Sequence, residues 1–535
     1  MSEAAQGQVT TTLTRPEIQL TSQPAPSGWR ARLRPHRAQL LILLILALIP
    51  ELLLLATHPA IILAPDSREY IATAAQIAHT GKLVDARRTP GYPLLLALIF
   101  AVTGGRNLGA VVAVQLALAL LTPFGVYLLA YRLTYRRWVA CAAAGLVAIN
   151  LYMIDWTYSI RDETFSSLLT VALFLVTERL VRQPRPGWIV GFGVLGAFLI
   201  LTRPIYVFLP GIILVALAAR ALGMRRGRAL LPGIALACVL VYGVIAGYAG
   251  VNKLENGYLG ISYISDVNLF GKVIEYRLYE QPVAPQFQTM QRQVTVFAAA
   301  GGTLPWDFAR EYGYQGNNYA ALGAFARPLI LQHPVQYAIL TLHDLKQVWL
   351  VKPGIDSRGA RILAFDLMLA LARLDLLTYL ALPVVVFWLA WLLWRGWRNP
   401  ALFTTALLLL AVLGSMLMTA VGSYAEYYRL RAPIDWAYLV VFALMAFDAA
   451  GAALQWRRRR VLQQGQGQVA PLQPSRHAPP SPQGAEQGAG VAQVRDPDRP
   501  VRWPLTRLRP PFAVAPPRHP GYTARGVPDS ISGSS

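Results

Sequence analysis

Acidic residues stand at two places where an apolar run is about to begin. Asp66 follows Ala64-Pro65 and precedes a stretch with apolar residues at helical spacing. Asp162 and Glu163 directly precede a longer apolar run. Carboxylates at such a boundary can act as general bases or bind a metal ion. They can equally cap a helix, because its N-terminus attracts negative charge, so spacing alone leaves both interpretations open.

An arginine doublet follows the first acidic site. Arg87 and Arg88 stand shortly before the rigid Pro90-Gly91 turn. Guanidinium groups bind phosphate oxygens in pairs, so the doublet could clamp a phosphate group. Contact with lipid headgroups explains the doublet equally well.

Long apolar runs must position these polar residues. Of the 535 residues 55% are hydrophobic and only 14% are charged, too few charges to coat several soluble domains. A helix needs about 20 mostly apolar residues to cross a membrane. The ten candidate runs are 38–57, 108–130, 138–153, 164–181, 188–202, 205–222, 229–249, 376–394, 401–421 and 434–454. The sequence therefore predicts an all-α polytopic membrane protein with about ten transmembrane helices.

Arginines predict the orientation, because positive residues in short loops stay in the cytoplasm. With the N-terminus inside, every predicted inner loop is basic, from the arginines within 30–37 to the run 457–460. Both termini are then cytoplasmic, and both acidic sites lie on the outer face of the cell membrane. The net charge of +22 follows from this topology. We expect no nucleic-acid partner, because no basic stripe or recognisable binding module occurs.

Two outer loops and two tails complete the predicted organisation. The transmembrane domain spans 38–454, with a first outer loop at 59–107 and a large one at 250–375. We expect surface-lying helices in both loops, and the apolar run 94–102 is short enough to be interfacial or re-entrant. Residues 1–37 and 455–535 are predicted to be disordered basic cytoplasmic segments, the latter close to membrane lipids.

The order of these motifs resembles the GT-C glycosyltransferases, and within them the bacterial protein-mannosyltransferase-like and aminoarabinose-transferase-like group. The resemblance rests on the two acidic loops, on Arg-Thr-Pro-Gly-Tyr-Pro at 88–93 and on Leu-Thr-Arg-Pro at 201–204. It covers about residues 38–222. It returns at 426–433, Glu-Tyr-Tyr-Arg-Leu-Arg-Ala-Pro, which is similar to the last outer loop of the group.

The resemblance implies an integral-membrane transferase whose donor is a polyprenyl-phosphate-linked sugar. Asp66 would deprotonate an acceptor hydroxyl or amine, which attacks the anomeric carbon and inverts it. Arg87, Arg88 or Arg203 would stabilise the departing lipid phosphate. The acceptor would be a glycan, a lipid or a protein. Secondary site candidates are Glu69, Tyr70, Glu426, Arg429 and Arg431.

Asp162 and Glu163 have two roles open to them under this resemblance. They would hold a divalent metal ion together with Asp66, or fix the geometry of arginines and acceptor. Many relatives have two adjacent acids in the first loop, whereas here Asp66 is followed by Ser67. Metal dependence is therefore left open.

Two other functional classes stay in view. A transporter or flippase of lipid-linked sugars places ionisable groups within the membrane, and Glu51, after Pro50 in the first run, is such a group. A non-catalytic scaffold gives the acids and arginines no reason to converge. The glycosyltransferase interpretation predicts that Asp66 and the pair Asp162 and Glu163 share one outer cavity with at least one named arginine.

Overall fold

The computed structural model describes residues 34–57, 61–154, 156–224, 227–314, 316–350, 379–424 and 427–466. Most of these residues are helical, and the one isolated β-bridge among them pairs Ile62 with Ser159. Glu426 and the greater part of both predicted disordered segments lie outside the described residues. Backbone contacts divide the chain into residues 1–451 and residues 452–535. The first unit contains every candidate site residue.

Among the described residues, seven helices are long and apolar enough to cross a membrane. They are α2 (Arg37–Thr57), α5 (Leu108–Thr134), α8 (Glu163–Arg182), α10 (Phe208–Leu222) with the preceding 3-10 turn Pro204–Val207, α11 (Leu231–Asn256), α19 (Pro400–Gly422) and α21 (Asp435–Gln466). Each matches one of the ten predicted runs. The predicted all-α polytopic membrane fold is confirmed.

Four shorter apolar helices accompany them. They are α4 (Gly91–Thr103), α6 (Arg137–Ala148), α9 (Pro186–Thr202) and α18 (Leu382–Gly396). The last three match the remaining predicted runs and have 12, 17 and 15 residues, fewer than the roughly 20 of a typical span. Run 138–153 is broken at Ile149-Asn150, where the backbone leaves the helix before the single turn α7 (Leu151–Ile154). Proline bounds α9 on both sides, because Pro186 begins it and Pro204 follows Arg203 at its end.

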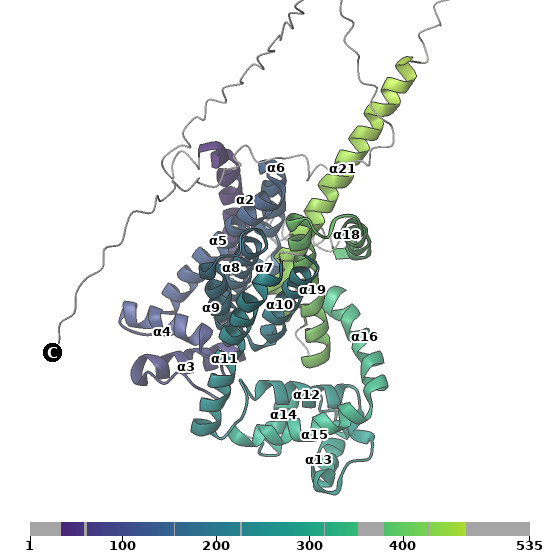
Figure 1. The fold of residues 1–535 in the computed structure, drawn as a ribbon. Helices are drawn as coiled ribbons and strands as arrows, with labels where there is room; N and C mark the ends of the chain where they lie inside the picture. The colour runs from purple at the N-terminus through teal and green to yellow at the C-terminus, as the bar shows by residue number, and fades with distance from the viewer. Residues whose placement is uncertain are drawn as a thin grey trace, which may run out of the picture. The chain divides into compact units, whose positions relative to one another are not determined.

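The first outer loop forms two helices. Apolar side chains join α3 (Pro65–Thr80) to α4 in a buried cluster that includes Tyr70, Tyr92 and Leu96. In Figure 1 the two helices lie side by side and run across the direction of the long bundle helices. The predicted run 94–102 is therefore the later part of a longer helix. This helix, α4, can begin at Gly91, before Pro93, because a proline is tolerated in the first turn of a helix.

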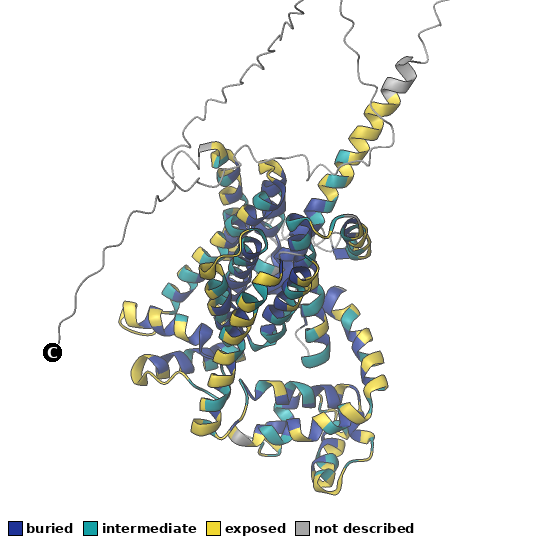
Figure 2. Ribbon diagram, viewed as in Figure 1, coloured by how far each residue is buried: buried dark blue, intermediate teal, exposed yellow. Residues whose placement is uncertain are grey.

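The large predicted loop is also helical over its described part. It contains α12 (Ile264–Glu275), α13 (Gln288–Ala299), α14 (Pro305–Glu311), α15 (Tyr319–Gln332) and α16 (Pro334–Leu350), here called the accessory helices. The first four pack around a core of their own that includes Phe270, Phe308 and Phe325. Figure 1 shows this group beyond the end of α11, with α16 leading back to α19. Figure 2 shows buried residues where these helices meet one another.

Candidate active site

Asp66 lies in the first turn of α3, but it does not cap that helix. Ser67 Oγ accepts a hydrogen bond from the backbone N of Ala64, the residue before α3, at 3.0 Å and so stabilises the start of the helix. The Asp66 carboxylate instead binds two guanidinium groups. Its Oδ1 lies 2.5 Å from Arg88 Nη2, and its Oδ2 lies 2.6 Å from Arg429 Nη2. Of the two interpretations left open by spacing, the structure favours a role in the site.

Arg88 is the centre of the first-loop contacts, and only 11% of its side chain is exposed. Besides Asp66, it binds Glu69, whose Oε2 lies 2.6 Å from Arg88 Nε. The guanidinium group also lies over the ring of Tyr70, 4.7 Å from the ring centroid. Burial of this group is tolerated because two carboxylates share its charge.

Arg87 also binds Glu69 and reaches the accessory helices. It forms an ion pair with Glu69, and its guanidinium carbon lies 5.6 Å from the ring centroid of Trp306 on α14. Its side chain is 39% exposed, which leaves it open to a ligand. Asp85 Oδ1 shapes the loop by accepting hydrogen bonds from the backbone N of Arg87 at 2.6 Å and of Arg88 at 2.9 Å.

Residues 85–90, here called the arginine loop, carry Arg87 and Arg88. The residues just before α12 attach this loop to the accessory helices. Ser262 Oγ donates to the carbonyl oxygen of Arg87 at 2.5 Å, and the Tyr263 backbone N donates to the carbonyl oxygen of Ala86 at 3.0 Å. The loop is therefore fixed both by the first-loop acids and by the accessory helices.

The second acidic loop is held beside the first. The Ile62 backbone N donates to Tyr158 O at 3.0 Å, forming part of the isolated bridge. Gln115 Nε2 on α5 donates to the carbonyl oxygens of Thr157 at 2.9 Å and Ser159 at 2.7 Å. Tyr92 of the Pro-Gly-Tyr-Pro segment donates to Gln115 Oε1 at 2.6 Å. These contacts bring the start of α8 to the start of α3.

Gly91 permits the close approach of α4 to the end of α9. A Cβ atom at this position would lie 2.6 Å from the Thr202 backbone N and Cα. No real Cβ contact is that short, and backbone atoms cannot rotate away, so the position requires glycine. The glycine thereby lets the arginine loop approach Arg203, which directly follows α9.

Asp162 and Glu163 are almost fully buried, with 3% and 1% of their side chains exposed. Arg203 Nη1 lies 3.3 Å from Asp162 Oδ1 and 3.3 Å from Glu163 Oε1. Arg429 Nε lies 2.5 Å from the same Glu163 oxygen. The Tyr70 hydroxyl donates to Asp162 Oδ1 at 3.3 Å. Arg429 therefore links the second acidic loop to Asp66.

These contacts join the candidate residues into one charged network. Its members are Asp66, Glu69, Tyr70, Arg87, Arg88, Asp162, Glu163, Arg203 and Arg429. Arg431 lies elsewhere. It pairs with Asp435 at 2.9 Å and donates to the carbonyl oxygens of Val348 and Trp349. Glu426 falls outside the described residues.

Burial and charge pairing together shift the pKa values of Asp66 and Asp162 in opposite directions. Burial alone would raise the pKa of Asp66, but Arg88 and Arg429 outweigh it and hold that pKa well below its usual range. Burial raises the pKa of Asp162, and the neighbouring Arg203 compensates only partly. Asp66 is therefore a carboxylate at any ordinary pH as long as both arginines stay in contact with it.

The three acids proposed for a metal ion do not form a metal site as arranged. Guanidinium groups bridge them, Arg429 between Asp66 and Glu163 and Arg203 between Glu163 and Asp162. No group of three or more His, Cys, Asp or Glu side chains in the described part of the chain is placed to hold a metal ion. This set of donors, bridged by guanidinium groups, does not fit a metal ion.

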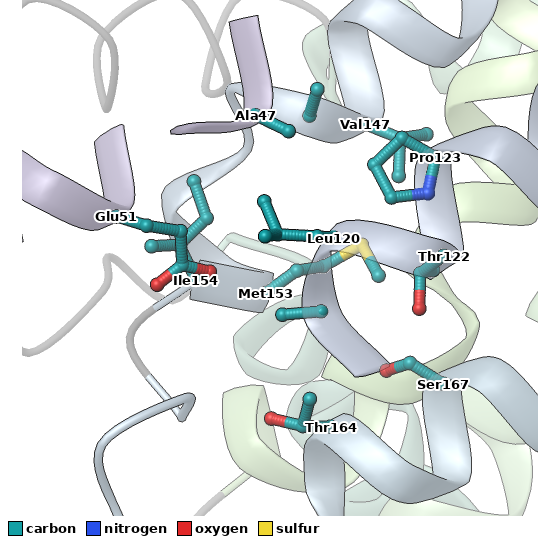
Figure 3. A pocket seen from close by; sticks show the side chains of 12 residues that line it. Ala47, Glu51, Leu120, Thr122, Pro123, Val147, Met153, Ile154, Thr164 and Ser167 are labelled. Atoms are coloured by element: carbon teal, nitrogen blue, oxygen red, sulfur yellow. The ribbon is translucent and has the colours of Figure 1, made fainter. Parts of the chain in front are cut away.

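A pocket lined by α2, α5, α6, α7 and α8 lies next to the network, since Thr164, which follows Glu163, is one of its lining residues. Glu51, Thr164 and Ser167 are among the polar residues that line it (Figure 3). Glu51 Oε1 accepts a hydrogen bond from Thr157 Oγ1 at 2.9 Å, and Glu51 O accepts one from the Tyr158 hydroxyl at 2.9 Å. The ionisable group that suggested a transporter thus contacts the second acidic loop.

Gln115 and Asp85 were not predicted from the sequence. A single amide within the apolar run 108–130 is a weak signal, because a polar residue inside a membrane helix usually has a specific partner. Here the partners are backbone carbonyl groups, which no side-chain pattern reveals.

A known family matches the part of the chain that carries most of the network. The family model described as dolichyl-phosphate-mannose-protein mannosyltransferase matches residues 87–246. The match begins at the arginine doublet and includes Asp162, Glu163 and Arg203. The resemblance to GT-C glycosyltransferases is confirmed. The match covers less than a third of the chain and supports a transferase of this type, and the seven long apolar helices are those of a multi-pass membrane protein.

Solved structures of two other proteins are similar to this chain. The oligosaccharyltransferase AglB from Archaeoglobus fulgidus, in complex with an inhibitory peptide and a dolichol-phosphate, is 12% identical, with a TM-score of 0.43 over 81% of this chain and 52% of that chain. This chain thus spans about half the length of the archaeal protein. ArnT from Cupriavidus metallidurans bound to undecaprenyl phosphate is 15% identical, with a TM-score of 0.31 over 80% of each chain. No curated protein matches the sequence.

Proposed function

We propose that this protein transfers a sugar from a polyprenyl-phosphate-linked donor to an acceptor hydroxyl or amine at the outer face of the cell membrane, with inversion. The observation that carries the proposal is the contact of Asp66 with Arg88 and Arg429 within a network that also holds Arg203. A carboxylate can accept a proton there while guanidinium groups receive a departing phosphate. The match to a mannosyltransferase family model supports the choice of a sugar.

The reaction is a single displacement at the anomeric carbon. The acceptor oxygen forms a bond to that carbon, and Asp66 takes the proton that the acceptor loses. The bond between the anomeric carbon and the phosphate oxygen breaks, and its electron pair stays on the lipid phosphate. That phosphate gains one negative charge, which Arg87, Arg88 and Arg203 stabilise. A leaving group stabilised in this way needs no general acid.

Donor binding also prepares Asp66 for its role. Arg88 and Arg429 are bound to the Asp66 carboxylate in the protein alone. A phosphate competes for the same guanidinium groups, and each contact that it takes over raises the pKa of Asp66 towards the ordinary value. A carboxylate with a higher pKa is a stronger base. The donor therefore binds before Asp66 becomes an effective base.

The test uses the purified full chain with polyprenyl-phosphate sugars that differ in their sugar, and it measures product by mass spectrometry. Asp66→Asn should lower the transfer rate by about 10² to 10⁴, because it removes the proton acceptor. The matched control is Asp307→Asn, which breaks an exposed ion pair with Arg310 on α14 and should leave transfer unchanged.

Two results would contradict this proposal. Unchanged transfer by Asp66→Asn would remove the catalytic assignment. No transfer from any donor, together with movement of a lipid-linked sugar across vesicle bilayers, would favour a transporter or flippase.

A further inference from the structure

A second charged cluster is buried outside the network. Lys272 on α12 is fully buried, and its Nζ donates to Glu275 Oε2 at 2.9 Å and to the Tyr427 hydroxyl oxygen at 2.7 Å. It also forms an ion pair with Asp344 on α16, and the same Asp344 oxygen accepts a hydrogen bond from the Tyr276 hydroxyl. A buried ammonium group is costly unless it is paired, and here three oxygens surround it.

The cluster fixes one end of the short helix that carries Arg429. Tyr427 is the first residue of α20 (Tyr427–Arg431), and its hydroxyl also donates to Glu275 Oε1 at 3.2 Å. At the other end, Arg431 pairs with Asp435 and donates to the carbonyl oxygens of Val348 and Trp349. A helix of five residues has little stability of its own, so these side-chain contacts determine where α20 lies.

Arg429 lies midway between these two anchors. Only 8% of its side chain is exposed, and it binds both Asp66 and Glu163. The three oxygens that surround Lys272 belong to Glu275, Asp344 and Tyr427, none of which is a member of the charged network. The most direct route from Lys272 to Arg429 runs through Tyr427, whose hydroxyl group Lys272 binds, and then along the α20 backbone.

We propose that Lys272 is a positioning residue that sets the placement of Arg429 through Tyr427, and that the accessory helices thereby control how the site binds a lipid phosphate. This inference rests on the proposed function. Without the lysine, the Asp344 and Glu275 carboxylates face Tyr427 with no cation between them. Repulsion and the lost hydrogen bond displace the start of α20, and a shift of about 1 Å in a charged group is enough to impair a site.

A double-mutant cycle separates positioning from general stabilisation. Lys272→Met, Arg429→Gln and the double variant are compared in the full chain for kcat and for KM of the donor. We expect Lys272→Met to lower kcat/KM about tenfold in the wild type and less than about twofold when Arg429 is already absent. Equal losses in both backgrounds would overturn the inference, because they show an effect independent of Arg429.

A second variant and a matched control cover the case in which Lys272→Met does not fold. Tyr427→Phe removes one hydroxyl group and retains the Lys272–Asp344 pair, and it should show the same dependence on Arg429. Arg327→Met breaks another ion pair of the accessory helices, with the buried Asp266. It should lower the unfolding temperature and leave kcat/KM unchanged. Loss of kcat/KM in this control equal to that in Tyr427→Phe would also overturn the inference.

Binding of undecaprenyl phosphate, followed as a rise in unfolding temperature, distinguishes the two proposals. If the wild type binds this lipid but transfers no sugar, the proposed function fails. The positioning role is then retained only if Tyr427→Phe weakens binding in the wild type and not in Arg429→Gln. A wild type that neither binds the lipid nor transfers sugar contradicts both.

Discussion

Asp66 receives its two arginines from distant parts of the chain. Arg88 comes from the loop that follows α3, whereas Arg429 comes from α20 near the last spanning helix. The carboxylate is therefore neutralised only after nearly the whole membrane unit has folded. Above the ordinary aspartate pKa of about 3.9 the two pairs stabilise the folded protein. That contribution is lost as pH falls through the lowered pKa of the native state.

This pairing leads to a prediction about pH. Because the pKa of Asp66 is held well below its usual range, kcat/KM for the donor should show no loss from Asp66 protonation between about pH 5 and 8. Arg429→Gln removes one cation, raises that pKa and should shift the acidic limb of the profile to higher pH. An acidic limb at the same pH in both proteins would contradict this account.

Residue types predicted most of the network but not all of its geometry. Asp66 was identifiable from its place just before an apolar run and Arg88 from the arginine doublet, whereas Arg203 was identified only through the resemblance to the GT-C glycosyltransferases. The choice between Arg429 and Arg431 was not predictable, since both lie in one short basic segment. Residues two apart on a helix point in different directions, and only the packing of α20 shows which one reaches Asp66. The contacts of Gln115 were not predictable either, because its partners are backbone carbonyl groups, which every residue has.

At the scale of elements, the lengths of the helices were easier to predict than the places where two helices come into close contact. The seven long helices and α9 were predictable from hydrophobicity alone, whereas α4 was predicted only as its later part 94–102 and α6 ends before its predicted run 138–153 does. The break at Ile149-Asn150 was not predicted, because no proline marks it, whereas the break before Pro204 was predicted from the sequence. The Pro-Gly-Tyr-Pro segment similarly indicated a turn, but its glycine belongs to the contact between α4 and α9.

Gly91→Ala tests that contact. The added Cβ would lie 2.6 Å from Thr202 backbone atoms, so α4 must shift, and we expect a loss of about 1–3 kcal/mol in the free energy of unfolding together with weaker donor binding. Thermal unfolding and donor titration measure both effects. Gly187→Ala, in the first turn of α9, meets no atom within 4 Å, so it should lower neither the free energy of unfolding nor donor binding. Equal behaviour of the two variants would contradict the packing argument.

At the scale of the whole molecule, α8 carries a cluster of charged residues at each of its two ends. Its first residue, Glu163, belongs to the site, whereas Glu178 near its other end pairs with Arg132 and Arg182. The helix has 20 residues and is about 30 Å long, equal to the thickness of the hydrocarbon layer. The two clusters therefore match opposite membrane surfaces, with the arginine-rich one on the predicted cytoplasmic side.

This orientation can be measured by cysteine labelling. In a background of Cys141→Ala and Cys238→Ala, we expect Thr289→Cys on α13 to react with a membrane-impermeant maleimide in intact cells. Arg228→Cys, in a predicted inner loop, should react only after permeabilisation. Both replaced residues are exposed in the structure. The reverse pattern would place the site in the cytoplasm.

The attachment of the arginine loop to the accessory helices uses main-chain oxygens of Ala86 and Arg87 as acceptors. Every amino acid carries such an oxygen, so substitutions at these two positions leave the joint intact. The side chains of Ala86 and Arg87 can therefore change during evolution, for example towards a different sugar or lipid, while the loop stays attached to the accessory helices.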